Sequence, residues 1–312
     1  MTSPDLDRLR QAQIAVAAAI AAGRNYVGDV GYVVGDLAGY RAADLYPVVS
    51  EAFADYVIPL RADAASLDAL LTRRGWEPAW SFGLFRRGRL AGFWLTGRDE
   101  GRTEAYCIMT GILPEARGSG GVDAMFARVL AATNALPHRL EVIRGNERAA
   151  RAYRRLGFRP VRVLHYYRLP RAKAVLGEPA WPAVVEPWRP AALPPESWLT
   201  YPAAWQNRRE AQRSARQPPA WLVVREADVL RGSAVLFTQD GDLAEIAVDP
   251  AARGRGIGRA LLAAALQHAS SGRVALTTVD ARDHVLCSWL ARCGAELTLS
   301  QDEMVHQGAG LQ

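Results

Sequence analysis

The sequence is poor in cysteine, histidine and lysine. Its cysteines, Cys107, Cys287 and Cys293, form an odd and sparse set without a CxxC pair, which argues against a disulfide framework and predicts a reducing, cytoplasmic location. The five histidines show no metal-ligand spacing, so we predict no bound metal. Lys173 is the only lysine, and arginine therefore supplies nearly all of the positive charge.

Long hydrophobic runs are also absent. No apolar run reaches about 18 residues, the length that suggests a membrane-spanning helix, so we expect no membrane association. The apolar stretch Ala15–Ala22 is short, the charges from Asp5 to Arg10 nearly cancel, and no plausible cleavage site follows, which argues against a signal peptide. We predict instead an amphipathic N-terminal helix over about Asp5–Ala22.

The composition is globular, with an uneven charge. Half of the 312 residues are hydrophobic and 22% are charged, and the length suggests two domains. Residues 1–171 carry a net charge of +7, whereas residues 172–312 carry −1. A basic half suits nucleic acid or a polyanionic cofactor, or reflects an arginine-rich genome. Aromatic and basic residues are not interleaved as in proteins that stack bases, so we expect no nucleic-acid partner.

Prolines mark a boundary near the middle of the chain. Seven of them lie between Pro170 and Pro195, and such a density disfavours helices and central strands. We therefore predict an N-terminal helical extension over 1–30, a first domain over 31–171, a proline-rich linker over 172–183 and a second domain over 184–312.

A repeat lies on either side of this linker. The first copy is Ile112–Gly121 (ILPEARGSGG), and the second is Val248–Gly258 (VDPAARGRGIG). In both copies a strand-like run precedes the loop and an amphipathic helix pattern follows it. A further strand, a short helix, a glycine and a last strand complete each half.

The upstream parts of the two halves are also similar. Ser81–Phe85 and Leu90–Leu95 predict a hairpin, as do Leu222–Arg225 and Leu230–Phe237. Helical patterns precede the hairpins, at Ala43–Phe53 and Ala65–Thr72 in the first half and at about Glu196–Arg216 in the second. The sequence therefore predicts an α+β fold, with a mixed sheet in each half.

The glycine-rich loop of the second copy carries the clearest chemistry. Glycines allow tight turns and a close approach of backbone N–H groups to a ligand. The start of the following helix adds unpaired N–H donors and a partial positive charge. Together these features suit a pyrophosphate. The loop matches neither a Walker loop nor the dinucleotide-binding fingerprint.

At Arg253–Gly258 the sequence resembles the GNAT superfamily of acyl-CoA N-acyltransferases, whose pyrophosphate loop has the pattern Gln/Arg-x-x-Gly-x-Gly/Ala. The resemblance covers about 31–171 and 184–307 and implies two tandem GNAT folds, each a twisted mixed sheet flanked by helices. It also implies acetyl-CoA as co-substrate, with a strand that pairs with pantetheine and splays from its neighbour. The cofactor-binding residues that it implies are Ile246, Ala247, Val248, Arg253, Gly254, Arg255, Gly256, Ile257 and Gly258 in the second half, and Ile112, Arg117, Gly118, Ser119, Gly120, Gly121 and Asn146 in the first.

The first half resembles the family most closely after its loop. Leu140-Glu141-Val142 and the run from Asn146 to Phe158 match the family's Leu-Glu-Val and Asn-x-x-Ala-x-x-x-Tyr-x-x-x-Gly-Phe motifs. The resemblance implies that Glu141 is a general base and that Tyr153 protonates the leaving thiolate. Asn146 then contacts the CoA arm or caps its helix. In the loop, however, Val122 stands where the second half has Gly258.

Each of these assignments has a structural alternative. Tyr153 is also explained as a packed aromatic residue, and Asn146 as a helix N-cap. Glu141 is also explained as a structural hydrogen-bond acceptor. The stripe of Arg144, Arg148, Arg151 and Arg155 suits the CoA 3′-phosphate or an acidic substrate, but a solvated helix face explains it as well.

The second half departs from the family at the positions of the acid and the base. Leu290 stands opposite Tyr153, Thr278 opposite Glu141, and Asp283 opposite Asn146. The better phosphate loop therefore lies in the second half, and the better acid–base set lies in the first. We slightly favour the first half as the catalytic one.

The function predicted from the sequence is transfer of an acetyl group from acetyl-CoA to a primary amine of a small molecule or peptide. The alternative is an acyl-CoA-binding sensor or scaffold without turnover. We expect a monomer or a homodimer, since two GNAT units in one chain can mimic a dimer.

Overall fold

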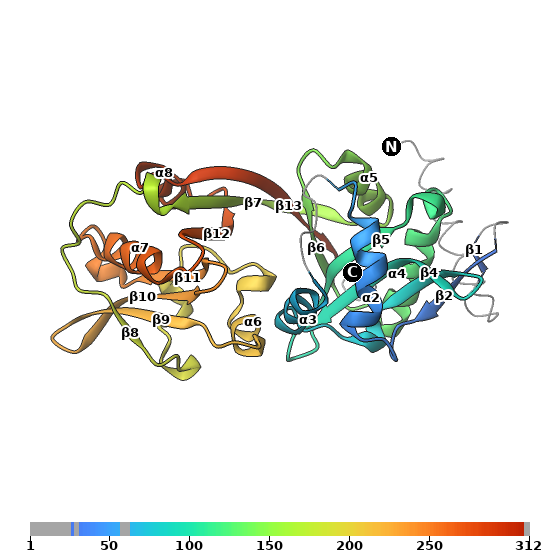
Figure 1. The fold of residues 1–312 in the computed structure, drawn as a ribbon, viewed down its shortest axis with the longest axis horizontal. Helices are drawn as coiled ribbons and strands as arrows, with labels where there is room; N and C mark the ends of the chain where they lie inside the picture. Colours follow the sequence, from blue (N-terminus) through green and yellow to red (C-terminus); the bar gives the residue numbers. More distant parts are fainter. Residues whose placement is uncertain (1–25, 28–30, 57–62, 309–312) are drawn as a thin grey trace. The chain divides into compact units, whose positions relative to one another are not determined.

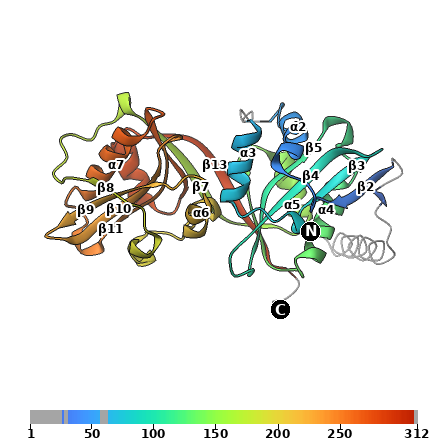
Figure 2. The same cartoon turned by 60° about the horizontal axis from the view of Figure 1, so that its bottom comes forward.

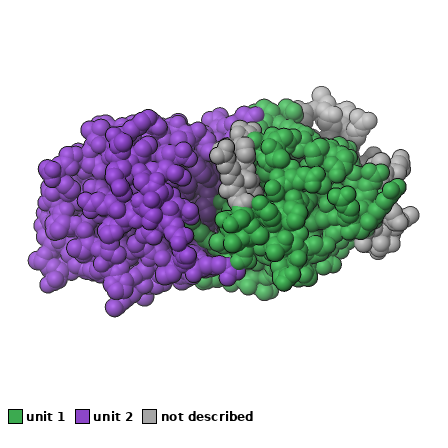
Figure 3. Space-filling model, viewed as in Figure 1, with its two compact units in different colours: residues 1–140, 146–159, 305–312 green, residues 141–145, 160–304 purple. Residues whose placement is uncertain are grey.

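A computed structural model describes residues 26–27, 31–56 and 63–308 (Figure 1). The predicted N-terminal helix over Asp5–Ala22 lies outside these residues. The chain divides into two compact units, which Figure 3 colours separately. Unit 1 comprises the residues up to 140, residues 146–159 and the residues from 305 onward. Unit 2 comprises residues 141–145 and 160–304.

Unit 1 is a sheet with helices on both faces. Its strands are β1 (Tyr26–Val27), β2 (Tyr32–Asp36), β3 (Phe82–Arg86), β4 (Arg89–Arg98), β5 (Ala105–Ile112) and the beginning of β6 (His138–Ile143). Its helices are α2 (Ala42–Ala52), α3 (Ala64–Arg73), α4 (Gly121–Ala132) and α5 (Glu147–Arg155), with 3₁₀ turns η1 (Pro78–Trp80) and η2 (Pro114–Ala116). The strands follow the order β1-β2-β3-β4-β5-β6, and each pair is antiparallel except β5 and β6.

Adjacent residues of β4 show how the helices cover this sheet. Phe93 and Trp94 point to opposite faces, because side chains alternate along a strand. Phe93 packs beside Phe53, just after α2, with ring centroids 6.3 Å apart. Trp94 packs against Phe126 of α4, 4.9 Å away. Figure 2 shows α2 and α3 on one side of the strands, with α4 and α5 on the other.

Unit 2 repeats the plan with fewer regular helices. Its strands are β7 (Arg159–Pro170), β8 (Val184–Glu186), β9 (Ala220–Glu226), β10 (Val229–Phe237), β11 (Asp242–Val248), β12 (Arg273–Asp280) and most of β13 (Glu296–His306). Its helices are α6 (Arg209–Ser214), α7 (Ile257–His268) and α8 (His284–Arg292), with 3₁₀ turns η3 (Arg171–Lys173), η4 (Pro190–Ala192), η5 (Glu196–Trp198), η6 (Trp205–Asn207) and η7 (Pro250–Ala252). The strands follow the order β13-β7-β12-β11-β10-β9-β8, with β11 and β12 parallel.

Two cores cover the two faces of this second sheet. The larger core joins α7 and α8 to the strands, and Ile257, Leu261, Leu262 and Leu266 of the predicted helix are all buried in it. The smaller core is built on Trp221, Val223 and Val235, and Trp188 packs against it.

The local signals in the sequence place most elements correctly. Both predicted hairpins are confirmed as β3–β4 and β9–β10, and the helices predicted from Ala43 and Ala65 are confirmed as α2 and α3. The short helices after β6 and β12 begin where the sequence supplies a cap. Asn146 accepts from the Ala149 N–H at 3.1 Å, and Asp283 accepts from the Leu286 N–H at 2.9 Å.

The helical prediction over Glu196–Arg216 is wrong. The segment holds only the 3₁₀ turns η5 and η6 and the six-residue helix α6. Pro202 lies in its middle, and a proline removes a backbone donor and pushes the preceding residue toward extended conformations. Tertiary contacts described below hold the rest of the segment against β11 and β12.

Each unit includes strand residues from the other half of the sequence. Residues 160–170 of β7 belong to unit 2, whereas Val305 and His306 of β13 belong to unit 1. His306 packs between Phe126 and Phe158, with ring centroids at 5.3 and 5.5 Å. The compact units therefore differ in residue range from the predicted domains, and residues 172–183 lie within unit 2.

No helix in the described part of the chain is long and apolar enough to span a membrane. Residues 26–27, 31–56 and 63–308 also contain no cluster of three or more histidine, cysteine, aspartate or glutamate side chains arranged to hold a metal ion.

Candidate functional site

The two glycine-rich loops have the same backbone geometry. Gly118 and Gly254 have φ values of +81° and +78°, and Gly120 and Gly256, which cap α4 and α7, have +82° and +87°. These left-handed conformations favour glycine. Val122, which replaces the third glycine, lies within α4, after the turn. The departure of the first loop from the family pattern therefore leaves its conformation intact.

The strand before each loop parts from its parallel neighbour. Pairing between β5 and β6 covers Ala105 and Tyr106 only, among the described residues, although β5 continues to Ile112. Pairing between β11 and β12 is likewise confined to Asp242 with Ala275 in the described part of unit 2. Both strands thus part from their parallel neighbours, and part of each strand edge does not pair with that neighbour.

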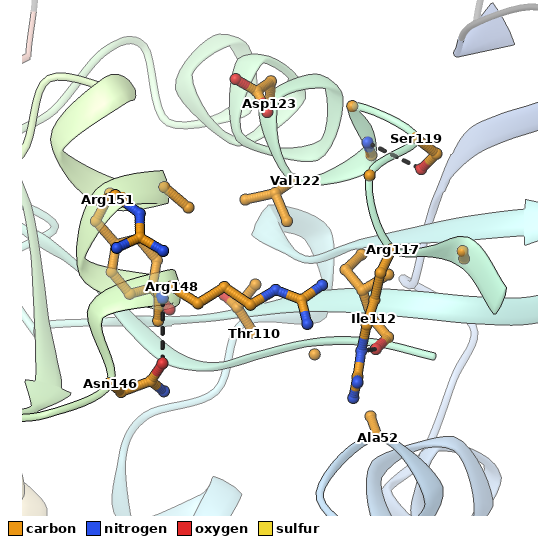
Figure 4. A pocket seen from close by; sticks show the side chains of 18 of the residues that line it. Ala52, Thr110, Ile112, Arg117, Ser119, Val122, Asp123, Asn146, Arg148 and Arg151 are labelled. Carbon is orange, nitrogen blue, oxygen red and sulfur yellow. Dashed lines mark hydrogen bonds between the residues drawn. The ribbon is translucent and has the colours of Figure 1, made fainter. Parts of the chain in front are cut away.

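A cavity of about 800 Å³ lies beside the loop of unit 1 (Figure 4). This volume is in the range of small-molecule and cofactor sites. Among the residues lining it are Ile112, Arg117, Gly118, Ser119, Gly120, Gly121, Asn146 and Tyr153. One cleft therefore brings together every residue that the sequence predicts for the first half, with the exception of Glu141.

The cleft is rich in arginine. Arg117, Arg148, Arg151 and Arg155 line it, together with Asp55 and Asp123. Arg155 forms two hydrogen bonds with Asp123, at 2.9 and 2.7 Å. Figure 4 shows Arg148 reaching from α5 across the cleft above Thr110. The predicted arginine stripe thus faces the cleft at three of its four positions, whereas Arg144 pairs with Asp302 in unit 2.

Tyr153 projects toward the end of β5. Its ring packs edge-on against Trp94, with centroids 6.2 Å apart. Burial, with smaller contributions from Cys107 and Tyr56, raises the pKa of Tyr153 well above its ordinary value, although a hydrogen bond with Thr110 opposes the shift. Tyr153 therefore keeps its proton at neutral pH, as a proton donor must, although the raised pKa makes it a weaker acid than an exposed tyrosine.

The thiol of the buried Cys107 stays protonated at neutral pH. Burial raises the pKa of its thiol to about 12, and its sulfur lies 3.0 Å from the Thr110 hydroxyl.

The loop arginines act as braces in both units. Arg117 donates from Nε to the Ile112 carbonyl at 3.3 Å, and both its Nη atoms donate to Asp55 at 2.7 Å. Arg253 repeats this pattern, with bonds to the Val248 carbonyl at 3.4 Å and to the Trp198 carbonyl at 2.9 Å. Each arginine thus ties the end of the strand to the segment that precedes the hairpin. The sequence alone gave no signal for Asp55 as a partner.

The loop of unit 2 is covered by the chain itself. The Trp181 indole donates to the Arg255 carbonyl at 2.8 Å, and its ring lies 4.8 Å from the Arg255 guanidinium. Arg255 also pairs with Glu226. Behind the loop, a Cβ placed on Gly258 would meet the Trp289 ring at 3.5 Å. Tryptophan side chains thus lie on both sides of the better-matching loop.

The gap between β11 and β12 is filled as well. Asn207 donates to the Thr277 carbonyl at 2.9 Å and to the Thr278 hydroxyl at 3.1 Å. Only about 40 Å³ of cavity remains in this gap, lined by the segment 199–207 and the two strands. A larger cavity of about 580 Å³ adjoins this gap. Arg209 and Glu245, which form an ion pair, line the larger cavity.

Glu141 lies in unit 2 rather than beside Tyr153 in the cleft. Its carboxylate accepts from Gln206 at 3.1 Å and from the Tyr166 hydroxyl at 3.5 Å. Tyr166 in turn donates to the Gln301 side chain at 2.9 Å. The structure therefore does not bring the two predicted catalytic residues together within one unit.

Comparison with known proteins gives a family match within the second half of the chain. Residues 190–295 match the model of the acetyltransferase (GNAT) family. The chain carries a GNAT domain. The matched segment is an acyltransferase domain, and the fold described above agrees with this match. No curated protein sequence matches the chain.

Solved structures show the GNAT fold over nearly the whole chain. A GCN5-related N-acetyltransferase from Sphaerobacter thermophilus is 15% identical, with 92% of this chain and 99% of that one covered and a TM-score of 0.65. A putative acetyltransferase from Pyrococcus horikoshii is 13% identical, with 89% of each chain covered and a TM-score of 0.65. A tandem GNAT protein from the clavulanic acid biosynthesis pathway is 15% identical, with 90% and 99% covered and a TM-score of 0.63. At these identities the likeness concerns the fold, and it includes a tandem arrangement.

Proposed function

We propose that the protein transfers an acetyl group from acetyl-CoA to a primary amine, and that unit 1 binds the acetyl-CoA. The observation that carries this proposal is the cleft of unit 1, which unites the glycine loop, the open edge of β5, Asn146 and Tyr153. In unit 2 the Trp181 indole bonds to the Arg255 carbonyl of the corresponding loop, and Asn207 occupies the gap between the strands.

The residues of the cleft suit a CoA ester. A Cβ built on Gly118 would meet no atom within 4 Å, and the same holds for Gly254 in unit 2, so both loops leave this side of the backbone open to a ligand. The backbone N–H groups at the start of α4 have no helical partners and favour an anion such as pyrophosphate. The surrounding arginines add positive charge. The cleft thus offers a phosphate cradle at one end and a proton donor at the other.

The chemistry assigns Tyr153 one step. A bound acyl-CoA supplies an activated thioester carbonyl, which a neutral amine attacks while the C–S bond breaks. The Tyr153 phenol, which is protonated at neutral pH, gives its proton to the departing sulfur.

The amine must lose a proton before or during this attack. The resemblance to the family names Glu141 as the general base, and this assignment stays a prediction, because Glu141 belongs to unit 2 and does not line the cleft of unit 1. It is a carboxylate on β6, the strand that parts from β5, and hydrogen bonds from Gln206 and Tyr166 fix its orientation.

An acyl-CoA sensor without turnover is the second candidate function. The observation that favours it is the placement of Glu141 outside the cleft that contains Tyr153. Both functions require CoA to bind in unit 1, and only the enzyme releases free CoA when an amine is added.

Calorimetric titration of acetyl-CoA into the full chain tests the proposal. We expect one site per chain, lost when Gly118 is replaced by tryptophan and retained when Gly254, its counterpart in unit 2, is replaced in the same way. Release of free thiol with a panel of amines then distinguishes the enzyme from the sensor. Two sites, or one site that depends on Gly254, would show that the cofactor binds in unit 2.

A further inference from the structure

The β3–β4 hairpin of unit 1 carries three arginines at its tip. Arg86 ends β3, Arg87 lies in the turn, and Arg89 begins β4, and all three residues are exposed. None of their guanidinium groups forms a hydrogen bond or an ion pair with a residue in the described ranges 26–27, 31–56 and 63–308. The tip of the hairpin therefore concentrates positive charge that no carboxylate of the described chain binds.

The two facing arginines destabilise the hairpin by themselves. Arg86 and Arg89 are register partners, so their side chains lie opposite each other on one face of the sheet. Like charges in directly opposite positions repel, and the repulsion weakens the strand pair. Tyr32, the register partner of Arg86 on β2, stacks with the Arg86 guanidinium at 5.3 Å. An anion between the two arginines removes this repulsion.

The corresponding hairpin of unit 2 has a different charge pattern. Glu226 at the end of β9 pairs with Arg231 at 3.0 Å and with Arg255. Ala227 takes the turn position of Arg87, with a φ of +46° against +49°. The turn conformation thus does not require an arginine. The same supersecondary element is neutralised by ion pairs in unit 2 and left positively charged in unit 1.

A cavity of about 250 Å³ lies beside the arginines of unit 1. It is lined by Tyr32, Arg86, Arg87, Arg89, Leu90, Ala91, Leu113 and Glu115. Three guanidinium groups thus face one carboxylate, and the wall is positively charged. The cavity shares no lining residue with the cleft that contains the glycine loop and Tyr153. It is smaller than a typical cofactor site, and its size suits a single small anionic group.

We propose that this cavity binds the phosphate group of a small soluble molecule other than CoA. A phosphate offers several acceptor oxygens and nearly two negative charges, whereas a single carboxylate offers two oxygens and one charge. Planar guanidinium groups bind such oxygens through paired, charge-assisted hydrogen bonds. A phosphate between Arg86 and Arg89 satisfies both groups at once. The inference is independent of the proposed function, because the two cavities are separate.

Calorimetry with inorganic phosphate tests the inference on the full chain, at low ionic strength and with saturating acetyl-CoA. Under the proposed function acetyl-CoA fills the glycine loop of unit 1, so phosphate cannot bind there. We expect one phosphate site per chain. Arg86→Gln/Arg89→Gln should weaken phosphate binding by at least about tenfold, because charge-assisted contacts carry the affinity. Succinate, a dicarboxylate, should bind the unmodified protein at least about tenfold more weakly than phosphate.

A matched control removes the same charge elsewhere in unit 1. Arg102 and Arg159 are exposed and line neither cavity. Arg102→Gln/Arg159→Gln should change the phosphate affinity by less than about twofold, because exposed charges far from a site are screened. A thermal melt establishes that each variant is folded, and Arg86→Gln or Arg89→Gln alone serves if the double variant is not.

Three results would overturn the inference. They are the absence of a phosphate site in the acetyl-CoA-saturated protein, an equal loss of affinity in the two double variants, and binding of succinate as tight as that of phosphate. Each of them leaves the proposed function standing. If acetyl-CoA itself does not bind, the proposed function fails. The phosphate titration of Gly118→Trp, which has a bulky side chain in the glycine loop, then tests this cavity by itself.

Discussion

Tyr153 carries the most direct prediction at the scale of single residues. Tyr153→Phe removes the phenol and keeps the ring that packs against Trp94. We expect kcat to fall by about tenfold to a hundredfold with little change in CoA affinity, because an acid acts on the leaving group rather than on binding. CoA thiolate also leaves unassisted, which sets the lower end of this range.

The pH dependence follows from the direction of the pKa shift. Burial raises the pKa of Tyr153 well above its ordinary value, so the protonated form, which is the active one, persists as the pH rises through 10. The rate of the unmodified enzyme should therefore show no alkaline decline below pH 10. Glu141→Gln is the companion variant, and it should lower kcat at neutral pH, where a general base must be ionised. An unchanged kcat in that variant would make Glu141 a structural acceptor for Gln206 and Tyr166.

At the scale of elements, the brace between Arg117 and Asp55 joins the phosphate loop to the segment after α2. A phosphate ligand and a brace respond differently to substitution. Lysine keeps the charge that a phosphate needs but cannot reproduce the three hydrogen bonds to Ile112 and Asp55.

We therefore expect Arg117→Lys to weaken acetyl-CoA binding by roughly tenfold, about as much as Arg117→Ala. The reason is that lysine cannot form the two parallel hydrogen bonds that Arg117 donates to Asp55. Asp55→Asn should produce a smaller loss. The measurement is the calorimetric Kd for each variant, with Arg128→Ala as a control that leaves the brace unchanged. Substantial recovery of affinity with lysine would instead show that Arg117 binds phosphate directly.

Elements with local signals could be predicted from the sequence, and the others could not. Hairpins, loops and capped helices depend on a few neighbouring residues, such as Asn146 with the Ala149 N–H. The irregular path over 199–207 depends instead on Asn207 meeting Thr277, 70 residues away. The phosphate-binding loops show the same limit of sequence-based prediction. The motif alone favours Arg253–Gly258 as the better phosphate-binding loop, and only the folded chain reveals that Trp181 bonds to the Arg255 carbonyl of this loop.

At the scale of the whole molecule, the composition of the units predicts how the chain can be divided. Unit 1 includes Val305 and His306, and unit 2 includes residues 160–170. A cut at the predicted linker therefore removes His306 from its place between Phe126 and Phe158. We expect a fragment of residues 1–171 to be much less stable than unit 1 in the full chain.

Thermal melts of the fragment and of the full chain measure this difference. We expect co-expression of residues 172–312 to restore a cooperative transition and acetyl-CoA binding to the fragment. A stable fragment that binds acetyl-CoA alone would show that the residues from 305 onward are dispensable for unit 1.

The exchange of strand residues has a consequence for synthesis on the ribosome. A protein with two consecutive domains can complete the first while the second is still being translated. Here the first unit lacks His306 until nearly the whole described chain has been made. Its final packing must therefore wait for translation to reach the last strand, and we expect unit 1 to stay only partly formed for most of that interval.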